Sequence, residues 1–230
     1  DHFTIGIVDD VTGSSLEEKT SANTAAEGTI ECKFWGLGGD GTVGANKNSV
    51  KIIGEATDKY TQAYFYYDAK KSGGVTQSHL RFSDEPIHAT YLVQSADFVA
   101  VHNAAYLEKF DVCRELKQGG TFLLNCRWSA DQLEEKLPAS LKRQLAEKNA
   151  RFYIIDASDI ALKLGLGSRT NTVLQAAFFQ LADIISMNVA VKAMKDAISK
   201  TYLVKAGQKV VDMNCAAVDE GVRALHKVEI

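Results

Sequence analysis

The sequence has no run of apolar residues approaching the roughly 20 that span a bilayer. Its amino end has no basic segment followed by an apolar run, which is the pattern of a secretory signal. These two absences predict a soluble protein that is not secreted and has no membrane partner.

Charge of either sign is also not in excess. Lysine and arginine together number 26, aspartate and glutamate 29, and the formal net charge is −3. A chain without a surplus of cations has little electrostatic attraction for nucleic-acid phosphates. Nucleic acid is therefore not an expected partner.

Cysteine is scarce and widely spaced. The four residues Cys32, Cys113, Cys126 and Cys215 form no C-x-x-C pair, so their spacing fits neither a zinc site nor an iron–sulfur site. A chain of this length builds its own core and has no need of a disulfide framework. We predict buried free thiols in a reducing compartment and no metal site.

The composition is that of a globular protein, with 46% hydrophobic and 24% charged residues. It excludes a disordered or collagen-like chain. After a short β-branched run, residues 9–28 are small, polar and acidic, so residues 1–28 are predicted to form an arm or linker. Compact apolar runs begin near Ile30, which places one folded domain at residues 29–230.

Within that domain, short apolar runs alternate with helical patterns, as in a βαβ chain with a mainly parallel sheet. The predicted strands cover residues 30–35, 62–67, 97–102, 121–126 and 151–155. Between the first two strands, a helix is predicted over residues 43–58, where apolar positions recur on one face. We expect this segment to form a right-handed βαβ unit over residues 30–68.

The remaining chain is mostly helical by pattern. Short helices are predicted over residues 133–137, 141–147 and 158–164, and longer ones from residue 172 to the carboxyl end. The fold class is therefore α/β, with a mainly parallel central sheet, helices on both faces and a C-terminal helical layer.

A glycine-rich turn at residues 36–47 follows a predicted strand and opens a predicted helix, and it contains G-x-G-x-x-G. Glycine allows positive φ and a close approach of backbone N–H groups to a ligand. A helix N-terminus adds unpaired donors and a positive partial charge. The turn predicts a phosphate or pyrophosphate ligand.

The spacing of residues does not match two known phosphate-binding motifs, the Walker A loop and the thiamine diphosphate motif. A Walker A loop needs Gly before its Lys and Ser or Thr after it, whereas Lys47 stands between Asn46 and Asn48. The residues Gly-Asp-Gly at 39–41 resemble the start of a thiamine diphosphate motif. That motif continues with an asparagine, and none occurs between Asn48 and Asn103.

Two other ligands remain open. An NAD site would use Asp68, at the end of the second predicted strand, to bind a ribose. A phosphorylated nucleotide such as coenzyme A would use the cations Lys47, Lys70 and Lys71. A third interpretation is a structural module that docks subunits and binds no nucleotide.

Several motifs in order carry a family resemblance: residues 3–12, 36–47, 70–74, 78–82 and 167–172. Together they resemble the gamma-type, coenzyme A-binding domain of pyruvate:ferredoxin (flavodoxin) oxidoreductase, in the 2-oxoacid oxidoreductase family. The resemblance covers essentially the whole chain. It implies a reaction in which pyruvate and coenzyme A give acetyl-CoA, carbon dioxide and two low-potential electrons.

The resemblance also implies what lies outside this chain. Thiamine diphosphate, magnesium and [4Fe-4S] clusters belong to the parent enzyme, so the isolated domain is not expected to be active. Its partners are the other domains or subunits of that enzyme and, through them, ferredoxin or flavodoxin. The parent is expected to be a homodimer in the cytoplasm, or in a hydrogenosome-like organelle of an anaerobic eukaryote.

The resemblance assigns coenzyme A to residues of the turn, the next helix and a second strand-end loop: Gly38, Gly39, Asp40, Gly41, Thr42, Lys47 and Asn171. Backbone amides of the turn would cradle phosphates and Lys47 would add a positive charge. Asn171 would hydrogen-bond the same ligand, or only cap its own helix. The Asp40 carboxylate is expected to cap the helix. No residue is assigned a catalytic role.

Overall fold

The structure is a computed structural model that describes residues 2–7, 10–17, 24–69 and 73–229. Lys70 and Lys71, named above as candidate phosphate ligands, lie outside these ranges. Near the amino end, β1 (Thr4–Ile5) pairs in parallel with β2 (Ser15–Leu16). The division of the chain at residues 28 and 29 stays a prediction.

A seven-stranded sheet forms the centre of the molecule, in the order β4-β5-β3-β6-β7-β8-β9. Its strands are β3 (Ile30–Leu37), β4 (Tyr60–Tyr67), β5 (Val75–Ser83), β6 (Ala96–Val101), β7 (Leu116–Asn125), β8 (Arg151–Ile155) and β9 (His226–Val228). The neighbours β3, β6, β7 and β8 run parallel, and β4 points the same way because β5 is antiparallel to both β3 and β4. Only β5 and β9 oppose them, which confirms a mainly parallel sheet.

The predicted βαβ unit over residues 30–68 is wrong in one respect, because β3 and β4 are not neighbours. The chain turns back after β4, where the Asp68 N–H donates to the Val75 carbonyl at 3.1 Å, and β5 inserts between the two strands. This strand escaped prediction because one of its faces carries polar side chains. These polar side chains include His79 and Arg81, and both are buried.

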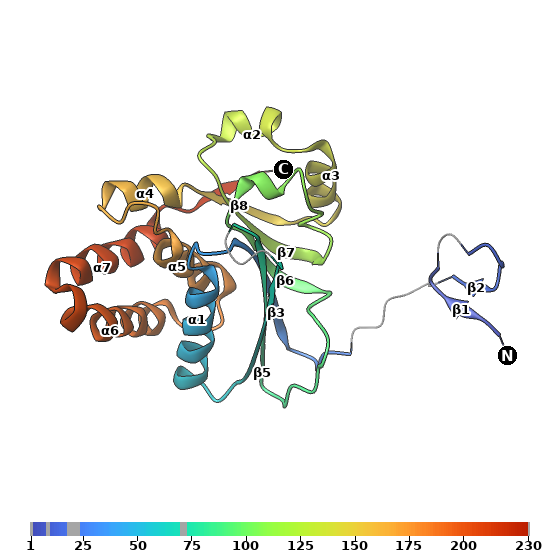
Figure 1. Cartoon of the computed structure of the whole chain (residues 1–230), viewed down its shortest axis with the longest axis horizontal. Coiled ribbons are helices and arrows are strands. Elements are labelled where there is room, and N and C mark those ends of the chain that lie inside the picture. Colours follow the sequence, from blue (N-terminus) through green and yellow to red (C-terminus); the bar gives the residue numbers. More distant parts are fainter. Residues whose placement is uncertain (1, 8–9, 18–23, 70–72, 230) are drawn as a thin grey trace.

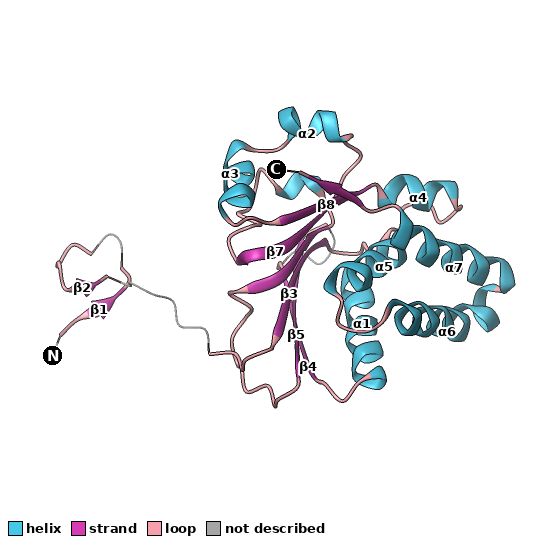
Figure 2. Ribbon diagram, turned by 180° about the vertical axis from the view of Figure 1, so that it is seen from behind, coloured by secondary structure: helices cyan, strands magenta, loops and turns pink. Residues whose placement is uncertain are grey.

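Seven α-helices are described: α1 (Thr42–Ala56), α2 (Ala130–Lys136), α3 (Ala139–Glu147), α4 (Ala157–Lys163), α5 (Asn171–Ala182), α6 (Met187–Ala206) and α7 (Gln208–Arg223). Helices α1 and α4–α7 lie on one side of the sheet and α2 and α3 on the other (Figures 1 and 2). This arrangement confirms helices on both faces and a C-terminal helical layer. No helix in the described ranges is both long and apolar enough to cross a bilayer.

Side chains alternate between the two faces of each strand, so each face has its own apolar core. On the α1 side, the rings of Phe34, Phe98 and Phe178 pack with centroids 5.1–5.5 Å apart. On the other side, Phe122 and Phe152 pack at 5.8 Å, in the same cluster as leucines of α2 and α3. The sheet is therefore held between two apolar layers.

The cysteines are free thiols. Cys32, Cys113 and Cys126 are buried, as predicted, whereas Cys215 is partly exposed. Burial raises the pKa of the Cys113 thiol to about 11. That thiol stays protonated at neutral pH and is a poor nucleophile.

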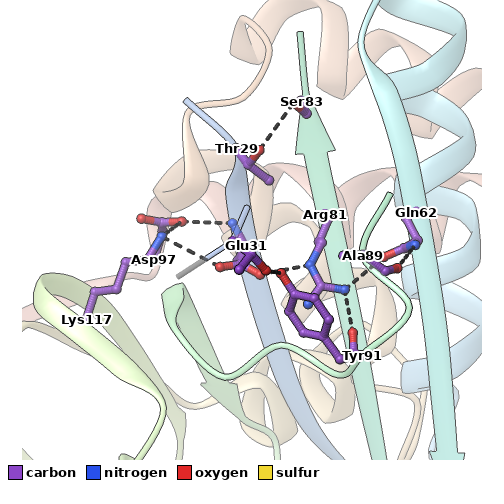
Figure 3. Close-up of polar contacts among 10 residues, drawn as sticks. Thr29, Glu31, Gln62, Arg81, Ser83, Ala89, Tyr91, Asp97 and Lys117 are labelled. Carbon is purple, nitrogen blue, oxygen red and sulfur yellow. Dashed lines mark hydrogen bonds and ion pairs between the residues drawn. The ribbon is translucent and has the colours of Figure 1, made fainter. Parts of the chain in front are cut away.

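A partly buried network of charged groups connects the β5–β3–β6 part of the sheet at the amino ends of the parallel strands (Figure 3). Arg81 Nε donates to Glu31 Oε1 at 2.8 Å, and both residues are 2% exposed. Arg81 Nη1 also donates to Gln62 Oε1 at 2.8 Å. Asp97 accepts from the Glu31 backbone N–H and from Lys117 Nζ, each at 2.8 Å. Each strand at this point therefore contributes a polar group to a shared network.

Candidate functional site

Two glycines allow the close packing at the predicted turn, which connects β3 to α1. A Cβ on Gly36 would lie 2.7 Å from the Thr42 Cβ, so glycine lets the first residue of α1 approach the strand. Gly41 has φ of +88°, and a Cβ there would lie 3.0 Å from Asn171 Cγ. Asn171 therefore lies against the turn, but it is the first residue of α5 and follows α4, so its predicted place in a strand-end loop is wrong. The N-cap of α5 is Thr170, so the alternative that Asn171 caps its own helix is also wrong.

Three of the five backbone amides of the turn that were expected to bind a phosphate donate hydrogen bonds within the protein instead. The Gly38 N–H donates to the Gly74 carbonyl at 2.8 Å and the Asp40 N–H to the Leu37 carbonyl at 2.9 Å. The Thr42 N–H donates to Asp40 Oδ1 at 2.8 Å. These bonds hold the turn in shape and leave the three amides without a free hydrogen.

Other amides of the turn remain available. The N–H groups of Gly39, Gly41, Val43 and Gly44 find no acceptor among the residues that the structure describes. Gly39 is exposed, has φ of +97° and has open space where a Cβ would stand. A ligand oxygen can therefore approach this backbone closely. Val43 and Gly44 add two donors of the first helical turn that the sequence analysis did not name.

The Asp40 carboxylate caps the turn. Its Oδ2 accepts from the Leu37 N–H at 2.8 Å and from Thr42 Oγ1 at 2.9 Å, while Oδ1 accepts from the Thr42 N–H. The predicted structural role of this side chain is confirmed. Its negative charge offsets part of the positive charge at the helix N-terminus, so a ligand phosphate has to lie away from it, over the free amides.

His102, which follows β6, is linked to the same turn. Thr42 gives its single hydroxyl hydrogen to Asp40, so His102 Nδ1 must donate to Thr42 Oγ1, at 2.7 Å. Nε2 then carries a lone pair and has no partner in the described part of the chain. Burial lowers the pKa of His102 to about 4, because the nearby Asp40 charge only partly opposes desolvation. The imidazole is neutral at physiological pH.

His79 on β5 is also buried. Its two ring nitrogens have no partner among the described residues. Desolvation, with the charges of Lys33 and Arg81, lowers the pKa of His79 to about 4.

The two buried histidines predict a pH-dependent stability. Their pKa values are about 4 in the folded state and 6.5 when unperturbed, so the unfolded chain binds protons first as the pH falls. The contribution of the two neutral histidines to the free energy of unfolding is therefore complete above pH 6.5 and is lost as the pH falls toward 4. Each histidine should lower the free energy of unfolding by about 1.4 kcal/mol per pH unit in that window.

Urea unfolding at pH 7 and pH 5 measures this effect. His79→Leu should remove about half of the histidine contribution to the pH dependence of the free energy of unfolding. An unchanged slope in His79→Leu would contradict the assignment.

A crevice of about 440 Å³ opens beside the turn, at the carboxyl ends of β3, β6, β7 and β8. Its lining is mostly polar and comprises Leu37, Asp40, His102, Asn103, Ala104, Asn125, Cys126, Arg127, Trp128, Ser158, Ser168 and Thr170. Asn125 bridges two of these strand ends, since its amide donates to the His102 carbonyl and accepts from the Ala157 N–H, each at 3.0 Å. Here the strand order reverses on passing from β3 to β6, the place where open α/β sheets bind ligands.

Lys47 and Asp68 lie apart from the amides. The Lys47 ammonium stands 5.3 Å from the centroid of Phe65 on β4, and the side chain is exposed. Asp68 is exposed at the turn between β4 and β5, with β5 separating it from β3. Two strand spacings amount to about 10 Å. An NAD carboxylate belongs on the strand next to the glycine turn, so this position does not favour the NAD interpretation.

His102, Asn125 and Arg127 line the crevice but were not among the residues predicted from the sequence. A signal existed, because His102 and Asn125 are among the last residues of two predicted strands and Arg127 follows the second of them, at the end where the glycine turn lies. It was not used because these residues form no motif among themselves.

The turn and the crevice lie at the switch point of an open α/β sheet that has helices on both faces, as in doubly wound domains. The chain belongs to the pyruvate ferredoxin/flavodoxin oxidoreductase family, whose model matches residues 31–224. It is 53% identical to a pyruvate:ferredoxin oxidoreductase of Moorella thermoacetica over 99% of this chain and 19% of that protein. A pyruvate-flavodoxin oxidoreductase of Enterobacter agglomerans is also 53% identical, over 100% of this chain and 20% of that protein. The chain thus spans about a fifth of the length of these relatives.

Solved structures share the fold. The pyruvate oxidoreductase subunit PORC of Thermotoga maritima has a TM-score of 0.69 at 23% identity, over 87% of this chain and 99% of that one. A 2-oxoglutarate:ferredoxin oxidoreductase of Magnetococcus marinus, solved with 2-oxoglutarate, coenzyme A and succinyl-CoA bound, has a TM-score of 0.64 at 20% identity. It is matched over 87% of this chain and 32% of its own. The same fold therefore occurs as a separate subunit and as part of longer chains.

Proposed function

We propose that this chain is the coenzyme A-binding domain of an enzyme that oxidises pyruvate to acetyl-CoA and carbon dioxide and passes two electrons to ferredoxin or flavodoxin. Family membership and the relatives' names support the enzyme class. The coenzyme A bound in the Magnetococcus marinus relative supports the ligand.

One observation supports the binding site above all: backbone amides of the glycine turn that have no acceptor among the described residues lie beside the crevice at the switch point. Gly39 and Gly41 have N–H groups without acceptors in the described part of the chain, and a substituent at Gly39 would meet open space. The residues present therefore fit a phosphate group. The polar lining of the crevice offers hydrogen-bond partners to the rest of a nucleotide.

The residues of this chain would bind and orient the ligand. The amides of Gly39 and Gly41 donate to phosphate oxygens, and the Asn171 amide side chain contacts the same region. Lys47, on a flexible stem in the second turn of α1, supplies a cation. Bound coenzyme A supplies a thiol that accepts the acetyl group. This domain would contribute binding energy remote from the reacting atoms.

The other parts of the enzyme lie outside this chain. Thiamine diphosphate, magnesium and [4Fe-4S] clusters would be held by other domains or subunits, which would also contact the electron acceptor. We propose that the parent enzyme is a homodimer located in the cytoplasm, or in an organelle in some eukaryotes.

Titration calorimetry of the 230-residue chain with coenzyme A tests this function. We expect saturable binding that weakens with added salt and that Lys47→Ala lowers about tenfold, through loss of one charge-assisted contact. Lys51→Ala is the matched control, since Lys51 lies one turn further along α1 and pairs with Glu55 at 3.6 Å. Dephospho-coenzyme A should bind more weakly than coenzyme A.

Three other calorimetric results would contradict coenzyme A binding at this site. Tighter binding of NADH than of coenzyme A, weakened by Asp68→Asn, would replace the proposed ligand by a dinucleotide. Equal losses from Lys47→Ala and Lys51→Ala would show a general charge effect and no specific site. An absence of binding to any of the three nucleotides would contradict a complete site within this chain.

A further inference from the structure

The strand β4 is the terminal strand of the sheet, so the backbone groups along one of its two sides pair with no other strand of that sheet. It pairs with β5 over all eight residues from Tyr60 to Tyr67 without a bulge, and none of the eight is charged or proline. Natural edge strands are normally shortened, bulged, charged or covered, because their free N–H and C=O groups pair with other strands. A long, regular, uncharged edge is therefore suited to pairing.

The pairing of β4 with β5 shows which backbone groups face outward. Asp68, the next residue, donates its N–H to the Val75 carbonyl, so even-numbered positions of this segment bond to β5. In an antiparallel ladder the direction alternates at each residue. The N–H and C=O groups of Thr61, Ala63, Phe65 and Tyr67 therefore point away from the sheet.

The side chains of β4 also differ between its two faces. Thr61 packs near Gly54 of α1, and Phe65 lies under Lys47 of that helix. The opposite face carries Tyr60, Tyr64 and Tyr66, which are 50%, 55% and 47% exposed. Half-exposed tyrosines are typical of the anchors of protein interfaces.

We propose that the edge of β4 pairs with β4 of a second copy of this chain, antiparallel and about a two-fold axis at Tyr64. In this register Ala63 faces Phe65 of the second copy and Thr61 faces Tyr67 of the second copy. All four residues with outward backbone groups then gain their hydrogen bonds. Tyr64 faces its own counterpart as a non-hydrogen-bonded pair, with Cα atoms about 4.5 Å apart.

Self-complementarity favours a second copy as the occupant. The two-fold axis brings outward positions opposite outward positions and the tyrosine face next to the tyrosine face. The strand has no charged residue, so no like charges face each other between paired residues of the two strands. The contact is closed, so pairing stops at a dimer. One strand pair with three tyrosines from each copy is a small interface, for which we expect a dissociation constant in the micromolar range.

Sedimentation equilibrium of the 230-residue chain, from micromolar to near-millimolar concentration, tests the dimer. We expect the mass to rise from 25.1 kDa toward twice that value. Ala63→Pro removes an outward N–H and leaves the bonds to β5 in place, so it should abolish the dimer. Ala63→Val keeps that N–H and should preserve it.

A second variant guards against misfolding of the proline variant. Tyr64→Lys puts two like charges opposite each other and should raise the dissociation constant at least about tenfold. Leu162→Lys changes an exposed side chain on α4, 67% exposed, and should leave the dissociation constant unchanged. Circular dichroism confirms that each variant is folded.

Amide hydrogen exchange supplies an independent readout. The amides of Thr61, Ala63, Phe65 and Tyr67 should become protected as concentration rises, whereas those of Gln62, Tyr64 and Tyr66 should be protected at all concentrations. A monomer at every concentration overturns the proposal. So does a dimer that survives both Ala63→Pro and Tyr64→Lys, since it would be formed by another surface. These outcomes are distinct from those of the coenzyme A titration.

Discussion

Replacing Arg81 by methionine is expected to lower the free energy of unfolding by about 3–5 kcal/mol. Arg81 and Glu31 form an ion pair at 2.8 Å and are each 2% exposed. Removing the guanidinium leaves a buried carboxylate without its main partner. The next cation, Lys117 Nζ, is 3.9 Å from Glu31 Oε2, too long for a hydrogen bond that would replace it. Arg81 also donates to the Tyr91 carbonyl at 2.8 Å, which loses this donor as well.

Urea unfolding of matched variants separates the cause of this loss. Lys51→Met breaks the exposed ion pair with Glu55 and should change stability by less than about 1 kcal/mol. The double variant Glu31→Leu with Arg81→Met removes both charges and should regain much of the loss. A change below about 1 kcal/mol in Arg81→Met would contradict the view that this pair is structurally important.

The same network explains which strands could be predicted. The strands β3, β4, β6 and β8 were predicted to within two residues of their bounds, whereas β7 begins five residues before its predicted start at residue 121. In β5, Leu80 and Phe82 face the α1 core, whereas His79 and Arg81 face a polar layer. Arg81 of that layer pairs with Glu31 of β3 and Gln62 of β4, and it also donates to the Tyr91 carbonyl in the segment before β6. The burial of such polar side chains depends on tertiary contacts and leaves no periodic apolar signal.

The candidate site was predictable to a similar extent. Glycine spacing and the strand-to-helix context located the turn, and chemistry assigned the cap to Asp40. The engagement of the Gly38 amide was not predictable, because its acceptor is the Gly74 carbonyl at the start of the unpredicted β5. The contact of Lys47 with Phe65 likewise depends on where β4 lies. Local sequence therefore located the turn, while the neighbouring strands decide which of its groups remain free.

Gly221→Ala is expected to destabilise the domain by about 3 kcal/mol, although alanine is the better helix former. Gly221 lies in α7 where this helix crosses α5. A Cβ there would stand 2.4 Å from the Val173 carbonyl oxygen and 2.9 Å from the Ala176 Cβ. Both contacts are with rigid groups, so the helices themselves would have to separate. That movement would disturb the buried packing around Ala217 and Val218.

Gly54→Ala in α1 is the control, and it should act in the opposite direction. A Cβ at Gly54 would meet only the Thr61 side chain at 3.6 Å, an ordinary contact. Alanine there should stabilise the domain by about 0.5–1 kcal/mol through helix propensity. Thermal or urea unfolding of both variants compares the two effects. Opposite signs would show that backbone contact between α5 and α7 requires the glycine, whereas stabilisation by both would mean that the helices separate at little cost. In the latter case the C-terminal layer would be held by side-chain packing alone.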